Sequence, residues 1–209
     1  YYSESFTNEA QVREAIEQVE KIKNIVVGKM TNSQYKNIKI IHDYIVDTSK
    51  YDENYESKNT YTIYGALIEH KCVCEGYAKS LKYIANAVGI PCEIIKGTAT
   101  NSTGVTEKHA WNCINLNNKW YYIDNTWNIT RNPNRFEESL KAKSFSGTYL
   151  LFGTDMAKTI GHHQSEYREP LIEQESYDTG LIRKRVRDLS KKHSFDNYEE
   201  PVFKSHIQR

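Results

Sequence analysis

Cys74 stands where a thiol could act as a nucleophile. A thiol attacks a carbonyl carbon as its thiolate, and the positive end of a helix stabilises that anion. The sequence predicts a helix that begins at Cys74 and ends near Gly89 and Pro91. Backbone N–H groups at such a helix start could also receive the oxyanion of an attacked amide. Judged alone, a free cysteine is more often a small, buried and unreactive residue.

Three further cysteines, Cys72, Cys92 and Cys113, leave other possibilities open. Cys72 is a rival nucleophile, although the predicted helix start favours Cys74. Four cysteines are too few for a disulfide scaffold in 209 residues, and no CxxC pair suggests zinc. Three fully paired connectivities and the fully reduced state all stay open, as does the redox compartment.

His109 and Asp124 are predicted to meet through the register of a β-hairpin. Strands are expected on either side of Asn117 and Asn118, two residues that tolerate the positive φ angles of a tight turn. In that register the two residues are diagonal neighbours on one face, about 7–8 Å apart at the backbone. A one-residue slip would place Asp124 on the opposite face.

A carboxylate beside an imidazole has a use in nucleophilic catalysis. It orients the ring and favours its protonated form, which stabilises a thiolate and later protonates a leaving amine. A polar hairpin face with an incidental histidine is the alternative for His109 alone. A nucleophile, a base and an orienting carboxylate in suitable settings together favour a Cys74–His109–Asp124 triad.

Four motifs in this order resemble the transglutaminase-like superfamily, and its bacterial branch is the best match. They are Cys74 to Lys79, Gly89 to Pro91, His109 to Asn112, and Trp120 to Trp127. The resemblance runs from about residue 38 to about residue 163. It implies an α+β, papain-like fold with the nucleophile helix packed on an antiparallel sheet, and a triad at Cys74, His109 and Asp124.

Two positions outside that triad also bear on the resemblance. Tyr64 stands where such proteins often place an aromatic residue, so it could donate its hydroxyl to the oxyanion. A tyrosine buried in the core is the alternative. Asn128 replaces an aspartate that members often show after the Thr-Trp pair. No EF-hand-type loop is present, so the calcium dependence of some animal members is not implied.

The remaining pattern predicts helices and strands around this core. Helices are expected from Asn8 to Gly28 and after a Thr31–Gln34 capping box. Further predictions, in chain order, are a strand at 93–98, a short helix within 131–143, a strand at 149–152, a loop at 161–163 and a basic helix at 182–192. The expected organisation is a helical extension over 1–30, a catalytic domain over 31–165 and a C-terminal extension over 166–209.

Composition excludes some partners and leaves the location open. The formal net charge is +1, from 28 Lys and Arg against 27 Asp and Glu, so no nucleic-acid partner is expected. No apolar run reaches the roughly 20 residues of a membrane span. The chain begins at Tyr1, so we expect a processed product whose targeting segment is not visible, in a secreted or cell-envelope setting.

The remaining candidate residues have ordinary structural roles as alternatives. His162 and His163 with Cys72 could suggest a zinc site, but adjacent histidines rarely reach one ion, so no metal or cofactor is expected. Trp111, Trp120 and Trp127 could line a cleft or form core. Two Asn-X-Ser/Thr acceptor patterns, at Asn101 and Asn128, mean little without a eukaryotic secretory route, and the late basic helix could be a solvated face.

Three functions are compatible with these residues. A peptidase or amidase would pass the acyl-thioester to water, and it is slightly favoured. A protein-crosslinking transglutaminase would pass the same thioester to an amine, a partition that depends on cleft shape and water exclusion. A non-catalytic peptide-binding module on the same fold is the third, and an intact triad argues against it. All three expect a protein or peptide ligand, with the oligomeric state open.

Overall fold

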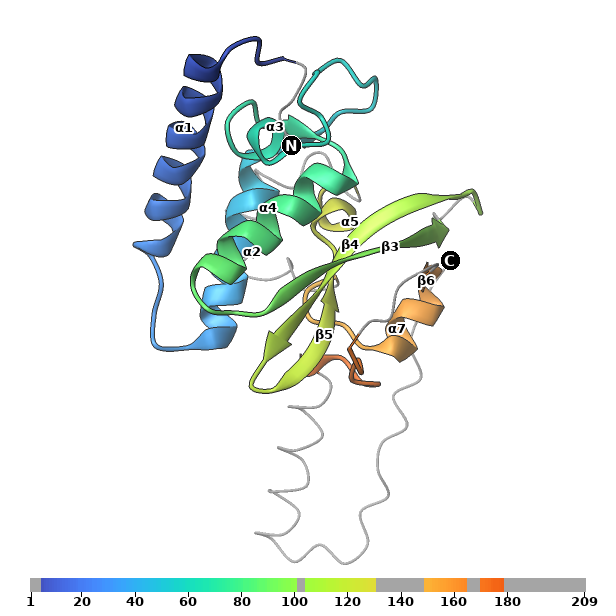
Figure 1. The fold of residues 1–209 in the computed structure, drawn as a ribbon. Helices are drawn as coiled ribbons and strands as arrows, with labels where there is room; N and C mark the ends of the chain where they lie inside the picture. Colours follow the sequence, from blue (N-terminus) through green and yellow to red (C-terminus); the bar gives the residue numbers. More distant parts are fainter. Residues whose placement is uncertain (1–4, 101–103, 131–148, 165–169, 179–209) are drawn as a thin grey trace, which may run out of the picture.

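The computed structural model describes residues 5–100, 104–130, 149–164 and 170–178 (Figure 1). Its first two helices are α1 (Glu9–Val27) and α2 (Gln34–Thr48). Asn8 caps α1 as predicted, because its side chain accepts from the backbone N–H of Gln11. The N-cap of α2 is Ser33 rather than the predicted Thr31. Thr31 instead bonds through its backbone N–H to the Asn37 side chain, 2.8 Å away.

Helix α4 (Cys74–Ala87) is the central helix, and it begins at the predicted residue. Its apolar face is buried, with Tyr77, Leu81 and Ile84 each at most 1% exposed. The short α3 (Ile63–Leu67) and a two-stranded parallel sheet of β1 (Lys50–Tyr51) and β2 (Lys71–Cys72) precede it. Strand β2 ends at Cys72, two residues before Cys74, so the chain passes almost directly from this strand into α4.

The main sheet has four antiparallel strands in the order β5-β4-β3-β6 (Figure 1). The strands are β3 (Cys92–Thr100), β4 (Thr106–Leu116), β5 (Lys119–Ile123) and β6 (His162–Gln164). Asn117 and Asn118, with φ of 54° and 65°, form the β4–β5 turn. Asn112 lies opposite Ile123, so the predicted hairpin register is confirmed.

Alternation along β4 divides the core between the two faces of the sheet. Ile114 joins the large cluster that contains Leu81 and Ile84 of α4. Trp111 and Cys113 join a second cluster on the other face. The mixed α+β class and the packing of α4 beside an antiparallel sheet are thus confirmed.

The second half of the chain departs from two predictions. Residues 149–152 are a turn and bend rather than a strand, with one isolated bridge between Phe152 and Tyr122. The predicted loop at 161–163 instead enters β6, which pairs with β3. Two short helices, α5 (Asn125–Thr130) and α7 (Thr154–Thr159), complete the described elements.

The helices predicted within 131–143 and over 182–192 lie outside the described residues. Among the helices that are described, none is both long and apolar enough to span a membrane.

Candidate active site

His109 and Asp124 form a close buried pair. Nε2 of His109 lies 2.7 Å from Oδ2 of Asp124, and the two side chains are 8% and 1% exposed. Asp124 directly follows β5, and its backbone N–H donates to the Tyr149 carbonyl at 2.9 Å. Its other oxygen, Oδ1, accepts from the backbone N–H of Trp127 at 3.2 Å. The hairpin register therefore brings together the two side chains that it was expected to join.

Cys74 is the first residue of α4 and is partly exposed. The N-cap residue, Val73, makes no side-chain capping bond. The N–H of Gly76 donates to the Val73 carbonyl at 2.9 Å, so the N–H groups of Cys74 and Glu75 are the candidates to meet a ligand. The Cys74 side chain lies close enough to His109 to contribute to the raised pKa of that imidazole. Because Nε2 of that ring faces Asp124, Nδ1 is the nitrogen left for the thiol.

The electrostatics of the pair favour an imidazolium. Burial lowers the pKa of His109, but the charge and hydrogen bond of Asp124 outweigh it, and a Cys74 hydrogen bond adds to them. Together they raise the pKa of His109 to about 10. Burial would raise the pKa of Asp124, yet the charge and hydrogen bond of His109 hold it well below its usual value. The carboxylate is therefore an acceptor for both of its partners.

The other three thiols are buried, and none of the four cysteines forms a disulfide. Burial raises the pKa of Cys72 and that of Cys92 well above the ordinary range of a thiol. Both groups consequently stay protonated and unreactive near neutral pH. Cys74 is the thiol with access to solvent and to an imidazole.

A second imidazole reaches the same carboxylate. Nε2 of His162 lies 2.8 Å from Oδ2 of Asp124, and the His162 side chain is fully buried. From the sequence, His162 is a candidate only for a zinc site with His163 and Cys72. The residues around His162 carry no signal for this contact, because it depends on the pairing of β6 with β3, a strand that is distant in the sequence.

One group of possible metal ligands occurs in the described residues, and it is made by His109, Asp124 and His162. One ligand atom from each lies within 4.8 Å of the others. The two short N···O contacts already satisfy these atoms as hydrogen bonds. Cys72 is outside this group, in the core cluster with Tyr77.

Tyr64 makes its contacts elsewhere. Its hydroxyl donates to Oε1 of Gln18 at 3.1 Å, and its ring meets Phe6 edge-on. The oxyanion role of Tyr64 stays a prediction, to which these contacts with α1 and the N-terminal segment lend no support.

The three tryptophans belong to the second core cluster. Trp111 is buried in it, whereas Trp120 and Trp127 pack against it partly exposed. Trp127 also lies beside His109, with ring centroids 5.9 Å apart.

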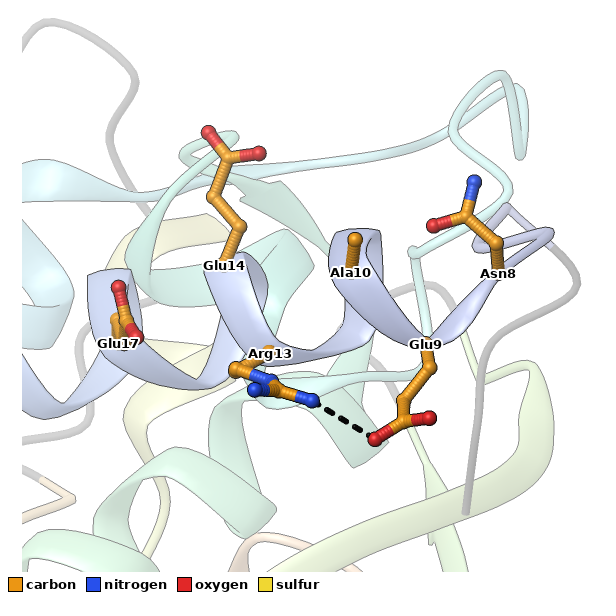
Figure 2. Close-up of a pocket in the computed structure, with 6 residues that line it drawn as sticks. All are labelled: Asn8, Glu9, Ala10, Arg13, Glu14 and Glu17. Atoms are coloured by element: carbon orange, nitrogen blue, oxygen red, sulfur yellow. Dashed lines mark hydrogen bonds and ion pairs between the residues drawn. The ribbon is translucent and has the colours of Figure 1, made fainter.

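A surface hollow on α1 contains none of the candidate residues. Figure 2 shows its lining, where Arg13 reaches back to Glu9 at 2.8 Å. The remaining lining residues are Asn8, Ala10, Glu14 and Glu17. Such charged side chains one turn apart are typical of a solvated helix face.

A family profile and several solved structures are similar to this chain. The profile of the transglutaminase-like superfamily matches residues 9–125, more than half of the chain. No curated protein matches. A solved structure titled as a TGase is 17% identical, with a TM-score of 0.49, and the match covers 91% of this chain and 50% of that one.

Two other solved structures have lower TM-scores. A protein from Cytophaga hutchinsonii described as a candidate cysteine protease is 20% identical over 52% of this chain and 38% of its own, with a TM-score of 0.44. The periplasmic domain of TgpA from Pseudomonas aeruginosa, bound to ethylmercury, is 15% identical over 60% and 47%, with a TM-score of 0.38. The chain spans half or less of the length of each of these three proteins. On the extent of the profile match, this chain belongs to the transglutaminase-like superfamily.

Proposed function

We propose that this protein is a cysteine-dependent acyl-transfer enzyme that hydrolyses amides of a protein or peptide, with Cys74, His109 and Asp124 as its catalytic triad. The observation that carries the proposal is the 2.7 Å contact between His109 and Asp124 beside a thiol at a helix start. The raised pKa of His109 supports an imidazolium beside Cys74 at neutral pH.

The proposed reaction has two steps. The Cys74 thiolate attacks the amide carbonyl, and the oxyanion meets backbone N–H groups at the start of α4. The C–N bond then breaks, and Nδ1 of His109 gives its proton to the leaving amine, which leaves an acyl-thioester. Neutral His109 next takes a proton from water, hydroxide attacks the thioester, and the thiolate departs. Asp124 holds the ring and offsets its charge in both steps.

Water is the proposed acyl acceptor because Cys74 is partly exposed. Transfer to an amine competes only where the thioester is shielded from water. The proposal also keeps the division into a catalytic domain over 31–165 with extensions over 1–30 and 166–209.

Selective alkylation tests the triad without a known substrate. Iodoacetamide at pH 6, followed by peptide mass spectrometry, should label Cys74 at least about tenfold faster than Cys72, Cys92 or Cys113. Cys74→Ser should lose the fast site and keep the three slow ones. Equal and slow labelling of all four thiols would contradict the triad and favour a binding module.

A second experiment identifies the acceptor. Glutamine-containing peptides are incubated with the protein and a fluorescent amine, and the products are weighed by mass spectrometry. Shortened peptides or deamidated glutamine support hydrolysis, and both should vanish in Cys74→Ser. Amine incorporation without hydrolysis would replace the hydrolase proposal with a transglutaminase.

A further inference from the structure

We infer that His162 is a positioning residue, which holds the Asp124 carboxylate in place for His109. This inference rests on the proposed function and adds a fourth residue to the proposed triad. Its basis is that two imidazoles share one carboxylate oxygen, at 2.7 Å from His109 and 2.8 Å from His162.

The sheet brings the two histidines to one face across a single strand. Gly97 of β3 lies opposite His109 of β4, and Ala99 lies opposite His162 of β6. Directly opposed residues, and residues two apart in a strand, point to the same face. Because Gly97 has no side chain and Ala99 only a methyl group, both imidazoles can reach over β3. Strand β6 thereby delivers a ring to the carboxylate that follows β5.

The protonation of both rings follows from the acceptor. Asp124 is ionised, since its pKa lies well below the usual value, and a carboxylate can only accept. Each Nε2 must therefore carry a proton and donate it to Oδ2. For His109, whose pKa is raised to about 10, both ring nitrogens carry a proton near neutral pH. For His162, the contact requires the proton on Nε2.

The surroundings of His162 favour Nε2 as its donor atom. Four aromatic rings enclose it, with centroid distances of 4.5 Å to Trp127, 5.0 Å to Trp111, 5.7 Å to Phe152 and 6.4 Å to Tyr149. Within the described part of the chain, Nδ1 of His162 is buried without a hydrogen-bond partner. A proton on Nδ1 would have no acceptor there, whereas a proton on Nε2 has the Asp124 carboxylate.

Nε2 is therefore the polar atom through which His162 acts, and its acceptor is Asp124. The surrounding aromatic rings hold the His162 imidazole in place, and the hydrogen bond of this imidazole holds the Asp124 carboxylate in place. With the backbone N–H of Trp127 donating to Oδ1 at 3.2 Å, both oxygens of Asp124 are held by hydrogen bonds. Loss of the His162 donor should allow the carboxylate to turn and weaken its hold on His109.

Two amide substitutions separate this role from general packing. Glutamine can place its Nε2 donor near the position of the imidazole Nε2, whereas asparagine is one carbon too short. Both are polar and smaller than histidine, so they disturb the aromatic enclosure in a similar way. We expect His162→Asn to lower the rate of Cys74 alkylation at pH 6 by about tenfold, and His162→Gln to stay within about threefold of the parent.

A combination with Asp124→Asn tests the route of the effect. If His162 acts through the Asp124 carboxylate, adding His162→Asn to Asp124→Asn should slow alkylation little further. His162→Phe keeps a ring in the enclosure, so it should lose reactivity while its thermal midpoint stays within about 5 °C of the parent. If His162 were purely structural, each substitution would lower the rate of Cys74 alkylation only in proportion to its loss of stability.

The outcomes distinguish this inference from the proposed function. Slow, ordinary alkylation of the parent would overturn the triad itself. If Cys74 of the parent is alkylated rapidly but His162→Asn and His162→Gln have equal alkylation rates, only the role of His162 is overturned. The same holds if the rate losses of Asp124→Asn and His162→Asn multiply fully in the double variant. Elemental analysis adds one more check: stoichiometric zinc in the parent that His162→Asn lacks would make His162 a metal ligand instead.

Discussion

The Asn128 side chain on α5 donates to Nε2 of His42 on α2 at a distance of 2.7 Å, and both residues are buried. Nδ1 of the same imidazole faces Asp43 at 3.0 Å. The Asn128 amide also reaches the backbone carbonyl of Asp124 at 3.4 Å. The hydrogen bond between Asn128 and His42 therefore links α5, which directly follows Asp124, to α2.

Asn128→Leu should destabilise the protein by about 1–3 kcal/mol, because it leaves the buried Nε2 of His42 without a donor. Urea denaturation measures the change in the free energy of unfolding. Asn24→Leu, at an exposed position of α1, is the matched control and should change it by less than about 0.5 kcal/mol. An effect of Asn128→Leu as small as that of the control would show that the bond does not contribute to stability.

Asp124→Asn should reduce the proposed activity by about 10³–10⁴-fold. An amide has one acceptor oxygen, whereas Asp124 accepts from two imidazoles on Oδ2 and from Trp127 on Oδ1. In either orientation, the NH₂ group of the amide faces a hydrogen-bond donor. The substitution also removes the negative charge that stabilises the His109 imidazolium. The rate constant for Cys74 alkylation at pH 6 should fall with the activity. Asp155→Asn, an exposed change of the same kind on α7, should leave both unchanged.

Much of this site could be predicted because its parts are local in the sequence. The β4–β5 hairpin closes through Asn117 and Asn118, so a short turn fixed the register that pairs His109 with Asp124. The start of α4 was visible from its apolar spacing. These features depend on neighbours within about twenty residues.

The contact of His162 could not be predicted because it depends on a distant strand pairing. Strand β6 has three residues, and nothing in so short a segment specifies β3 as its neighbour. The predicted N-cap residue of α2 is wrong for a different reason. Both Thr31 and Ser33 can cap a helix, and the Asn37 side chain decides between them by engaging Thr31.

The pH dependence of the proposed activity follows from the pKa of His109, which is raised to about 10. Protonation of the leaving amine needs the imidazolium, so kcat/KM should decline on the alkaline side near pH 10. A raised histidine pKa contributes stability that is complete below the ordinary value of 6.5 and is lost as the pH rises through about 10. The stability difference between the parent and His109→Gln should therefore shrink from pH 6.5 to pH 10. A difference that grows over this range would contradict a charged His109.

Gly76 allows the first turn of α4 to approach β2 closely. A Cβ at this position would lie 2.6 Å from Cβ of Cys72 and 3.0 Å from the Thr60 carbonyl oxygen. That oxygen also accepts from the N–H of Val73 at 3.0 Å, so neither neighbour can move without disturbing the start of the helix. Gly76→Ala should accordingly displace the turn that carries Cys74.

We expect Gly76→Ala to cost about 1–3 kcal/mol in the free energy of unfolding and to slow Cys74 alkylation. Gly28→Ala is the control, since Gly28 has a helical φ of −62° at the end of α1, and an added Cβ comes no closer than 3.3 Å to the Asn24 carbonyl oxygen. It should alter neither measurement appreciably. If Gly76→Ala lowered stability but left the alkylation rate intact, the turn would tolerate displacement, and the reactivity of Cys74 would depend on His109 rather than on the helix start.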